Sequence, residues 1–148
     1  MLNHVLLPLD GSKLAEQAIY PIKHVLRPDG QITLLHVAAN EAEAQTATDY
    51  LEGVAMRLKL DGYQVHIEVL DGDPPEVIVE RAVKLGVDLI AMCTHGRSGL
   101  QKLIYGSVTG EVLNNTLCPV LVIPNRVRQE KPQDAPTVTP DPSPGLAG

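Results

Sequence analysis

The sequence predicts an α/β fold with an open, doubly wound, parallel five-stranded sheet and helices on both faces. Segments that read as strands alternate with segments of helical periodicity, which is typical of βαβ units. In the segment 88–92, every residue after Asp88 is apolar, as expected for a central strand that helices cover on both faces. Asp-Gly pairs follow several of the segments and mark the turns between them.

The first strand is predicted at residues 4–9, an apolar run that ends at the turn Asp10-Gly11-Ser12. Apolar residues at spacings of three and four then predict a helix that reaches Leu26 and stops at Asp29-Gly30. Pro21 falls inside this pattern. Because proline removes a helical hydrogen bond, we expect a kink or an early break there.

The second strand is predicted at residues 31–37, and a long helix over about 41–60 is expected to end at Asp61-Gly62. In residues 63–70, apolar side chains alternate with polar ones. Because such alternation means that one face of the strand is wetter, this third strand is expected to lie at an edge of the sheet.

The second half of the chain adds two strands and two helices. The segment Asp73-Pro74-Pro75-Glu76 combines an N-cap aspartate, a proline at the first helical position and a glutamate three residues after the cap. It therefore predicts the start of a helix, which runs to Leu85. After the fourth strand at 88–92, a helix is expected from Ser107 to about Asn115 and a last strand at 120–123.

The periodic part of the chain ends at residue 125. Residues 132–148 contain five of the twelve prolines and show no apolar pattern, which is typical of disordered segments. We therefore expect one folded domain over residues 1–125 and a disordered, proline-rich C-terminal tail over residues 126–148.

Composition argues against several classes of function. The net charge is −6 and the chain has no Trp or Phe, whereas nucleic-acid binding favours basic patches and stacking rings. No apolar run reaches membrane-spanning length, and Pro8 and Asp10 interrupt the N-terminal run, so neither membrane insertion nor a signal peptide is expected. Two cysteines, Cys93 and Cys118, are too few for a disulfide framework and favour the cytoplasm.

Two loops carry the polar residues from which a site can be built. In doubly wound sheets, ligands bind at the carboxyl ends of strands, where the winding reverses. The first strand ends at Asp10, the fourth leads into Cys93-Thr94-His95-Gly96, and Gly106-Ser107 opens the helix that follows. Glycines and a helix N-terminus together make an anion cradle. The carboxylate of Asp10 and bound phosphates are both negatively charged. A metal ion or a sugar hydroxyl would therefore be needed between them.

Six short motifs, spread over about residues 3–124, share one order and spacing with a known family. They are Pro8-Leu9-Asp10-Gly11-Ser12, Leu35-His36-Val37, Asp88-Leu-Ile-Ala-Met92, Thr94-His95-Gly96-Arg97-Ser98-Gly99, Gly106-Ser107-Val108-Thr109 and Cys118-Pro119-Val120-Leu121-Val122. In these motifs the chain resembles the universal stress protein family. The nucleotide-binding branch of that family has Gly, two residues, Gly, nine residues, Gly, then Ser or Thr. Gly96, Gly106 and Ser107 match this pattern, whereas Cys93 stands at the first position.

The resemblance implies both a function and a site. It implies a universal stress protein that binds ATP, or AMP or ADP, with Mg²⁺ or Mn²⁺, and that regulates a stress response through an unidentified partner. It implies at most slow hydrolysis and no catalytic residue, the strand order 3-2-1-4-5 and a homodimer formed through residues 120–123. The implied nucleotide-binding residues are Asp10, Val37, Met92, Gly96, Arg97, Gly99, Gly106, Ser107, Val108 and Thr109.

Each of these residues has an implied role. Asp10 lies near the ribose or the metal, Val37 contacts adenine through its backbone, and Met92 lines the base. The glycines and the residues from 106 to 109 hold the ribose and phosphates. The small side chain of Cys93 is expected to weaken the site at most.

Other interpretations of the same residues remain open. Gly96 and Gly106 could be simple turn and helix-start glycines, Asp10 a turn residue, and Ser107 an N-cap. The chain could be a nucleotide-free dimeric scaffold, which Cys93 favours. It could also be an enzyme, either an ATPase or a thiol protein that uses Cys93. No lysine of the Walker A pattern follows the last glycine, so phosphoryl transfer is not expected.

Overall fold

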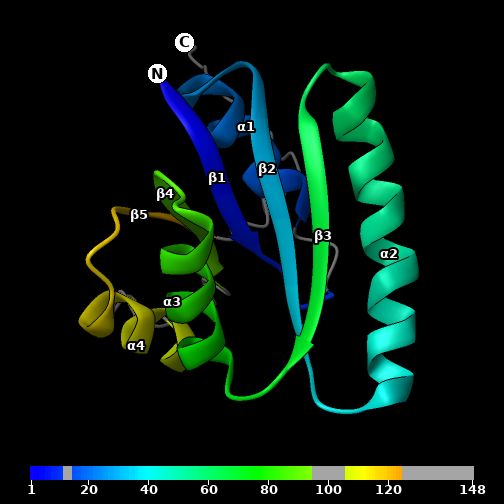
Figure 1. Cartoon of the computed structure of the whole chain (residues 1–148), viewed down its shortest axis with the longest axis vertical. Helices are drawn as coiled ribbons and strands as arrows, with labels where there is room; N and C mark the ends of the chain where they lie inside the picture. The colour runs from blue at the N-terminus through cyan, green and yellow to red at the C-terminus, as the bar shows by residue number, and fades with distance from the viewer. Residues whose placement is uncertain (12–14, 95–105, 125–148) are drawn as a thin grey trace, which may run out of the picture.

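Five strands form a parallel sheet in the order β3-β2-β1-β4-β5 (Figure 1). The computed structural model describes residues 1–11, 15–94 and 106–124. The strands are β1 (Leu2–Pro8), β2 (Leu26–Ala38), β3 (Gln64–Asp71), β4 (Leu89–Thr94) and β5 (Val120–Pro124). The parallel sheet and its order are therefore confirmed, and β3 lies at an edge of the sheet as predicted.

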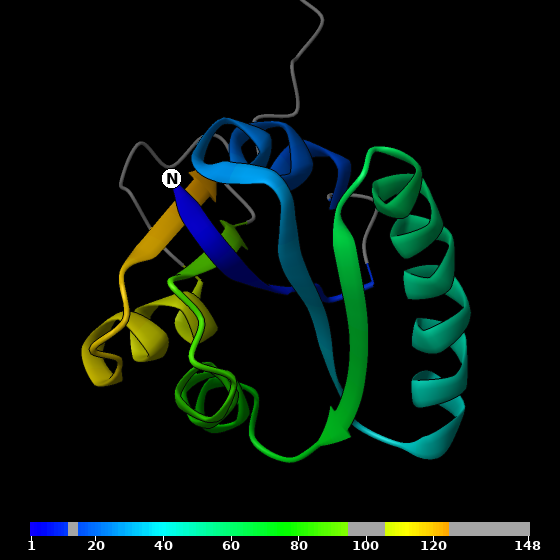
Figure 2. The ribbon, with the colours of Figure 1, turned by 45° about the horizontal axis from the view of Figure 1, so that its top comes forward.

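Within the described ranges, four helices cover the sheet, two on each face. They are α1 (Ala15–Val25), α2 (Glu41–Leu60), α3 (Pro74–Leu85) and α4 (Ser107–Asn115). Figure 2 shows α3 and α4 on one side of the sheet and α1 and α2 on the other. Because crossovers between parallel strands are right-handed, the change of face after β3 reverses the winding of the chain.

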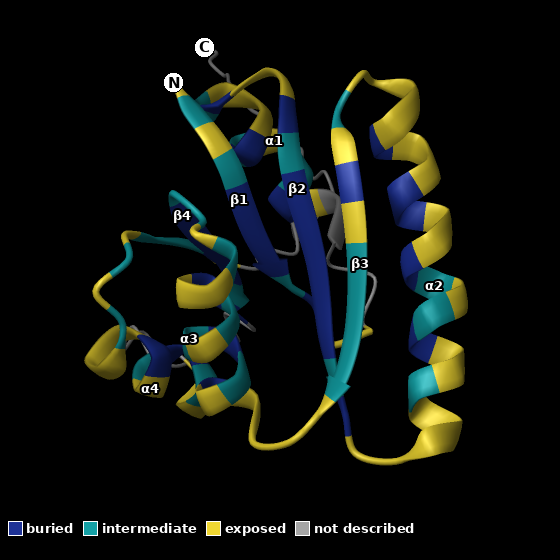
Figure 3. Ribbon diagram, in the orientation of Figure 1, coloured by how far each residue is buried: buried dark blue, intermediate teal, exposed yellow. Residues whose placement is uncertain are grey.

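Alternation along the strands divides the core into two clusters. Leu34 of β2 belongs to the cluster that α1 and α2 cover, whereas Leu35, the next residue, belongs to the cluster that α3 and α4 cover. Both leucines are fully buried, and Figure 3 shows buried residues along the middle of β1 and β2. Since the chain has no Phe or Trp, aliphatic side chains fill both clusters, as the composition predicts.

α1 ends earlier than the periodicity predicts, and β2 begins earlier. α1 ends at Val25, and Leu26, which the pattern assigns to the helix, is the first residue of β2. The helix continues through Pro21, so the early break considered there is not found. Ala18 and Ile22 anchor this helix in the core, and their burial offsets the one hydrogen bond that proline removes.

An irregularity in β2 explains the different boundary. Leu26 pairs with Leu2 and Gln31 pairs with His4, so β2 advances by five residues over a stretch in which β1 advances by two. Asp29 takes a positive φ of 59°, and a Cβ built on Gly30 would lie 2.7 Å from the side chain of Leu26. The Asp29-Gly30 pair, predicted to stop a helix, therefore lies in a bulge within a strand. A turn signal of this kind can interrupt either element, so local sequence does not distinguish them.

The predicted start and end of α3 are confirmed. The side chain of Asp73 accepts a hydrogen bond of 3.4 Å from the backbone N–H of Glu76, and Pro74 occupies the first turn. At the other end, Gly86 takes a left-handed φ of 64°, a conformation that glycine adopts without steric cost. The cap at Asp73 fixes the first turn of α3, which lies beside the pocket described below.

The ladder between β1 and β4 is short. The two strands pair only through Val5 with Leu89 and Leu6 with Ile90. β1 then ends at Pro8, whereas β4 continues to Thr94. Since the chain leaves β1 and β4 toward opposite faces of the sheet, the switch point of the winding lies between these two strands.

The predicted tail over residues 126–148 lies outside the described residues. Among the helices that the structure describes, none is both long and apolar enough to cross a membrane.

Candidate functional site

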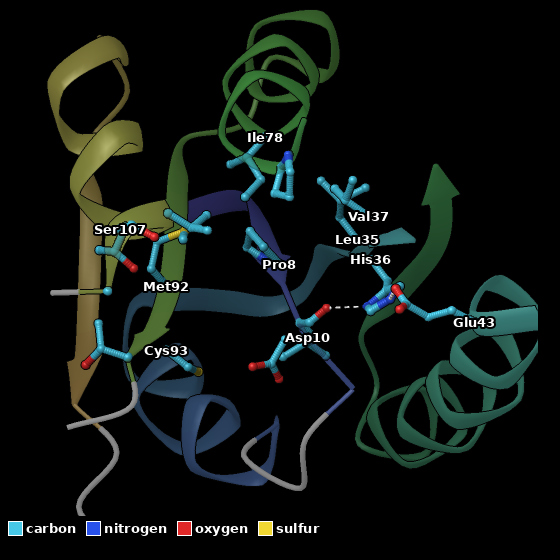
Figure 4. A pocket seen from close by; sticks show the side chains of 16 residues that line it. Pro8, Asp10, Leu35, His36, Val37, Glu43, Ile78, Met92, Cys93 and Ser107 are labelled. Atoms are coloured by element: carbon cyan, nitrogen blue, oxygen red, sulfur yellow. Dashed lines mark hydrogen bonds and ion pairs between the residues drawn. The ribbon is translucent and has the colours of Figure 1, made fainter. Parts of the chain in front are cut away.

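A pocket opens at the carboxyl ends of β1 and β4, at the switch point of the sheet (Figure 4). Its volume is about 410 Å³, which lies within the range of small-molecule sites. Residues of β1, β2 and β4 and the first turns of α2, α3 and α4 line it. β1 and β4 are neighbours in the sheet, so the ends of both strands reach the same pocket.

One wall of the pocket is apolar. It is formed by Leu35 and Val37 of β2, Met92 of β4, and Pro74 and Ile78 of α3. Three of these side chains, Leu35, Ile78 and Met92, belong to the core cluster that α3 and α4 cover. The wall is therefore continuous with the packed core, and an apolar ring of a ligand would lose water against it at little cost.

The first turn of α4 forms another side of the pocket. Gly106 is the N-cap, and among the described residues no side chain caps the helix. The interpretation of Ser107 as the N-cap is wrong, because Gly106 holds the non-helical N-cap position and Ser107 is the first helical residue. The first turn holds no acidic residue. Its N–H groups lack intrahelical partners, and the positive end of the helix dipole lies beside the pocket.

Asp10 reaches the pocket from the end of β1. The backbone N–H of Leu9 donates to the carbonyl of Leu35 at 2.8 Å, which holds this end of the chain on β2. Asp10 itself is exposed, and Gly11 takes a φ of 87°, which favours glycine and turns the chain sharply. The turn predicted at Asp10 and Gly11 is therefore present, and Ser12 lies outside the described residues.

A buried histidine joins the end of β1 to the start of α2 (Figure 4). Nδ1 of His36 donates to the carbonyl oxygen of Leu9 at 2.7 Å, and Nε2 lies 3.0 Å from Oε2 of Glu43. The same Oε2 accepts from the backbone N–H of Ala39 at 3.0 Å, and the N–H of Glu43 donates to Oδ1 of Asn40 at 2.9 Å. This arrangement resembles a capping box to which a histidine has been added.

The network stabilises the charged form of Glu43. Its hydrogen bond with His36, followed by that with the N–H of Ala39, lowers the pKa of the Glu43 carboxyl. Hydrogen bonds donated to a carboxylate favour ionisation. Glu43 therefore carries its negative charge at neutral pH, and it does so at the rim of the pocket.

Cys93 lies in β4 and lines the pocket. Burial, together with the nearby carboxylate of Asp10, raises the pKa of its thiol to about 11. The thiol is protonated at neutral pH, whereas a nucleophilic cysteine needs the thiolate. Its φ is not positive, so the backbone accommodates a side chain here without strain, although the family pattern has a glycine.

Most of the predicted site residues meet at this pocket. Those that line it are Asp10, Val37, Met92, Gly106, Ser107, Val108 and Thr109. The other three, Gly96, Arg97 and Gly99, lie outside the described residues. The fold thus brings segments that are distant in the sequence together at one pocket.

Sequence reasoning assigned no role to several residues that line the pocket, above all His36 and Glu43. A signal for Glu43 was available, because Asn40 and Glu43 have the spacing of a capping box. Pro74 and Ile78 could also have been found. Their helix start was predicted, and the first turns of helices that follow a strand lie at the carboxyl edge of a parallel sheet.

Comparison with known proteins gives one family. Residues 1–124 match the model of the Universal stress protein family. Universal stress protein MJ0531 of Methanocaldococcus jannaschii is 30% identical over 136 residues, which cover 80% of each chain.

Solved structures give the same result. The structure of MJ0577, also from Methanocaldococcus jannaschii, has a TM-score of 0.67 at 29% identity and covers 84% of this chain and 96% of that one. The universal stress protein from Archaeoglobus fulgidus in complex with dAMP has a TM-score of 0.60 at 17% identity, covering 83% and 98%. At 17% identity, the similarity to the Archaeoglobus fulgidus protein shows a shared fold.

Proposed function

Because this chain belongs to the universal stress protein family, we propose that its pocket binds ATP, or AMP or ADP in its place. The nucleotide-bound state then regulates a stress response through a protein partner. The observation that carries this proposal is the start of α4, where Gly106 supplies no capping side chain and which opens into the same pocket as Asp10 and the apolar wall. In this proposal the phosphates bind at the start of α4, the ribose lies at Asp10, and the base lies against the apolar wall.

The phosphates lie at the start of α4. A Cβ built on Gly106 would meet none of the described residues within 4 Å, which leaves room for phosphate oxygens above this glycine in the proposal. The first-turn N–H groups supply hydrogen bonds and the helix dipole favours their negative charge. Ser107 and Thr109 add hydroxyl groups at the same end of the helix. Gly96, Arg97 and Gly99 complete the phosphate site in this proposal.

The base lies against the apolar wall, between Val37 and Met92. This orientation leaves the carboxylate of Asp10 to accept hydrogen bonds from the ribose hydroxyls. A universal stress protein of the same fold has been solved with dAMP, which supports an adenine nucleotide as the ligand class.

A divalent cation would be held mainly by the nucleotide. Among the described residues, no group of three or more His, Cys, Asp or Glu side chains could hold a metal ion. Mg²⁺ or Mn²⁺ would therefore bind through the phosphates, with Asp10 as its protein ligand, because Mg²⁺ commonly uses one or two carboxylates together with substrate phosphates. The cation would offset the charge between the phosphates and Asp10.

We further propose a homodimer formed through residues 120–123. β5 is an edge strand, and Val120, Leu121 and Val122 are only partly buried. An unpaired apolar edge needs cover, which a second copy can supply. The cytoplasm suits such a protein, since Cys93 and Cys118 are both free thiols and belong to core clusters on opposite faces of the sheet.

One observation favours an alternative function. Cys93 places a side chain at the pocket where the nucleotide-binding pattern has glycine, and this favours a nucleotide-free dimeric scaffold. The thiol enzyme is the weaker hypothesis, because the raised pKa of Cys93 disfavours the thiolate. Heat denaturation of gently purified protein distinguishes nucleotide binding from the nucleotide-free scaffold. Adenine nucleotide is released only if the pocket binds it.

The substitution that tests the site is Gly106→Val. Because a Cβ there meets no neighbour within the part of the chain that the structure describes, the variant should fold normally while its side chain fills the phosphate space. We expect its ATP affinity to fall by at least about tenfold. Gly53→Val is the matched control, since Gly53 of α2 also has nothing within 4 Å of a built Cβ and does not line the pocket. Equal affinity in wild type and Gly106→Val would refute the site.

A further inference from the structure

The ladder between β1 and β2 stops one hydrogen bond early. Pro8 pairs with Leu35, and the N–H of Leu9 donates to the carbonyl of Leu35. In a parallel ladder, the carbonyl of Leu9 would next accept from the N–H of Val37. Among the described residues that bond is not made. The carbonyl of Leu9 accepts instead from Nδ1 of His36, at 2.7 Å.

Val37 therefore presents both of its backbone groups to the pocket. The N–H and C=O of alternate residues along a strand point to the same side. Since the carbonyl of Leu35 points toward β1, the backbone groups of Val37 do so as well. β1 has ended at that level, and Val37 lines the pocket. A donor and an acceptor from one residue thus face the space beyond the strand.

We propose that His36 is a positioning residue for base recognition. By hydrogen-bonding to the carbonyl of Leu9, its imidazole turns that oxygen away from the N–H of Val37 and leaves this N–H open to the ligand. An adjacent donor and acceptor complement the edge of adenine, which offers N1 as an acceptor and the exocyclic amino group as a donor. This inference rests on the proposed function, since it concerns the base of the bound nucleotide.

Three contacts hold the imidazole in this role. His36 is 5% exposed, and its Nε2 lies 3.0 Å from Oε2 of Glu43 in the first turn of α2. A Cβ built on Gly11 would lie 4.0 Å from Cε1 of His36, so the turn after Asp10 packs over the ring. Nδ1 donates to the carbonyl of Leu9, and the carboxylate of Glu43 faces the other nitrogen of the ring.

The first test needs no nucleotide. Amide hydrogen exchange of Val37 is measured by NMR in the free protein. His36→Leu removes the Nδ1 donor, so the Leu9 carbonyl becomes available to Val37 and exchange of the Val37 amide should slow by about tenfold. His36→Asn, whose amide nitrogen takes the place of Nδ1, should exchange as fast as wild type. His66→Leu, at an exposed histidine of β3, is the control and should leave Val37 unchanged.

The second test measures base discrimination by calorimetry, with ATP, ITP and inorganic tripolyphosphate as probes. Hypoxanthine reverses the adenine pattern, because its N1 donates and its C6 carbonyl accepts. Wild type should prefer ATP to ITP, His36→Leu should reduce that preference by about tenfold, and His36→Asn should restore it. Tripolyphosphate, which has no base, should bind all three proteins equally.

The outcomes separate the inference from the proposed function. A Val37 amide that exchanges equally fast in wild type and His36→Leu overturns the positioning role, as does an equal loss of ATP and ITP affinity. If His36→Leu does not fold, His36→Gln replaces it, since its longer amide reaches toward Glu43 rather than Leu9. If wild-type protein binds neither nucleotide, the proposed function is refuted. The exchange experiment then still shows whether His36 controls the hydrogen bond between the Val37 amide and the Leu9 carbonyl.

Discussion

Nε2 of His36 lies 3.0 Å from Oε2 of Glu43, so a buried strand residue is tied to the first turn of α2 at the rim of the pocket. This contact is the main reason why the pKa of Glu43 lies below its ordinary value of 4.5. A carboxyl group whose pKa is lower in the folded than in the unfolded protein stabilises the fold above the unfolded pKa. That contribution is lost as the pH falls through the folded pKa.

Glu43→Gln should therefore remove part of the acid sensitivity of the fold. As the pH is lowered from about 6 to about 3, the free energy of unfolding of wild type should fall more steeply than that of the variant. Urea unfolding at a series of pH values measures this difference. Glu52→Gln, at an exposed position of the same helix, is the control. Parallel loss of stability in wild type and Glu43→Gln would contradict the role given to this pair.

Gly30→Ala should destabilise the protein. A Cβ at Gly30 would lie 2.7 Å from the side chain of Leu26 and 2.9 Å from the carbonyl oxygen of Arg27, so the bulge of β2 must shift. A cost of about 1–3 kcal/mol is expected from this overpacking. Gly53→Ala should instead stabilise α2 by up to about 1 kcal/mol, because nothing crowds that position. Denaturant unfolding checks both, and a Gly30→Ala variant as stable as wild type would rule out the close approach.

The sequence predicted those features that depend on local chemistry or on shared motifs. The caps of α3 at Asp73 and Gly86 follow from local hydrogen bonding and from the freedom of glycine. The strand order came from the family resemblance. The end of α1 was misplaced, because Leu26 continues the helical spacing but is recruited into the sheet by its pairing with Leu2 of β1, which no local signal reports.

Long-range contacts explain what the sequence missed at the site. Asp10, Val37 and Gly106 were chosen by motif, and all three line the pocket. His36 acts through the carbonyl of Leu9, which lies 27 residues away, so spacing alone could not assign it. Ser107 was considered as the N-cap because serine favours that position, but the non-helical backbone of Gly106 places the N-cap one residue earlier.

Cys93 should react slowly with alkylating reagents at neutral pH. Since the pKa of its thiol is raised to about 11, only a small fraction is thiolate near pH 7, and the rate should rise about tenfold for each pH unit. The measurement uses iodoacetamide on protein with Cys118→Ser, so that one thiol remains. Saturating ATP should slow the reaction further. Fast alkylation near pH 7 would instead support the thiol enzyme.

Asp10→Asn should weaken nucleotide binding and reduce its dependence on the divalent cation. Loss of a charged hydrogen-bond acceptor at the ribose should raise the Kd for Mg-ATP by about ten- to hundredfold. Calorimetry with and without Mg²⁺ separates the two effects. Asp49→Asn, on the exposed face of α2, is the control. An unchanged Kd in Asp10→Asn would remove this carboxylate from the site.

The central claim is that the pocket at the switch point binds an adenine nucleotide. Calorimetric titration of nucleotide-stripped wild-type protein with Mg-ATP tests it most directly. We expect saturable binding of one ATP per chain in the micromolar range, with AMP as a competitor. No binding heat and no competition by AMP would contradict the claim, and Cys93 would then mark a pocket closed to nucleotides in a protein that acts as a scaffold.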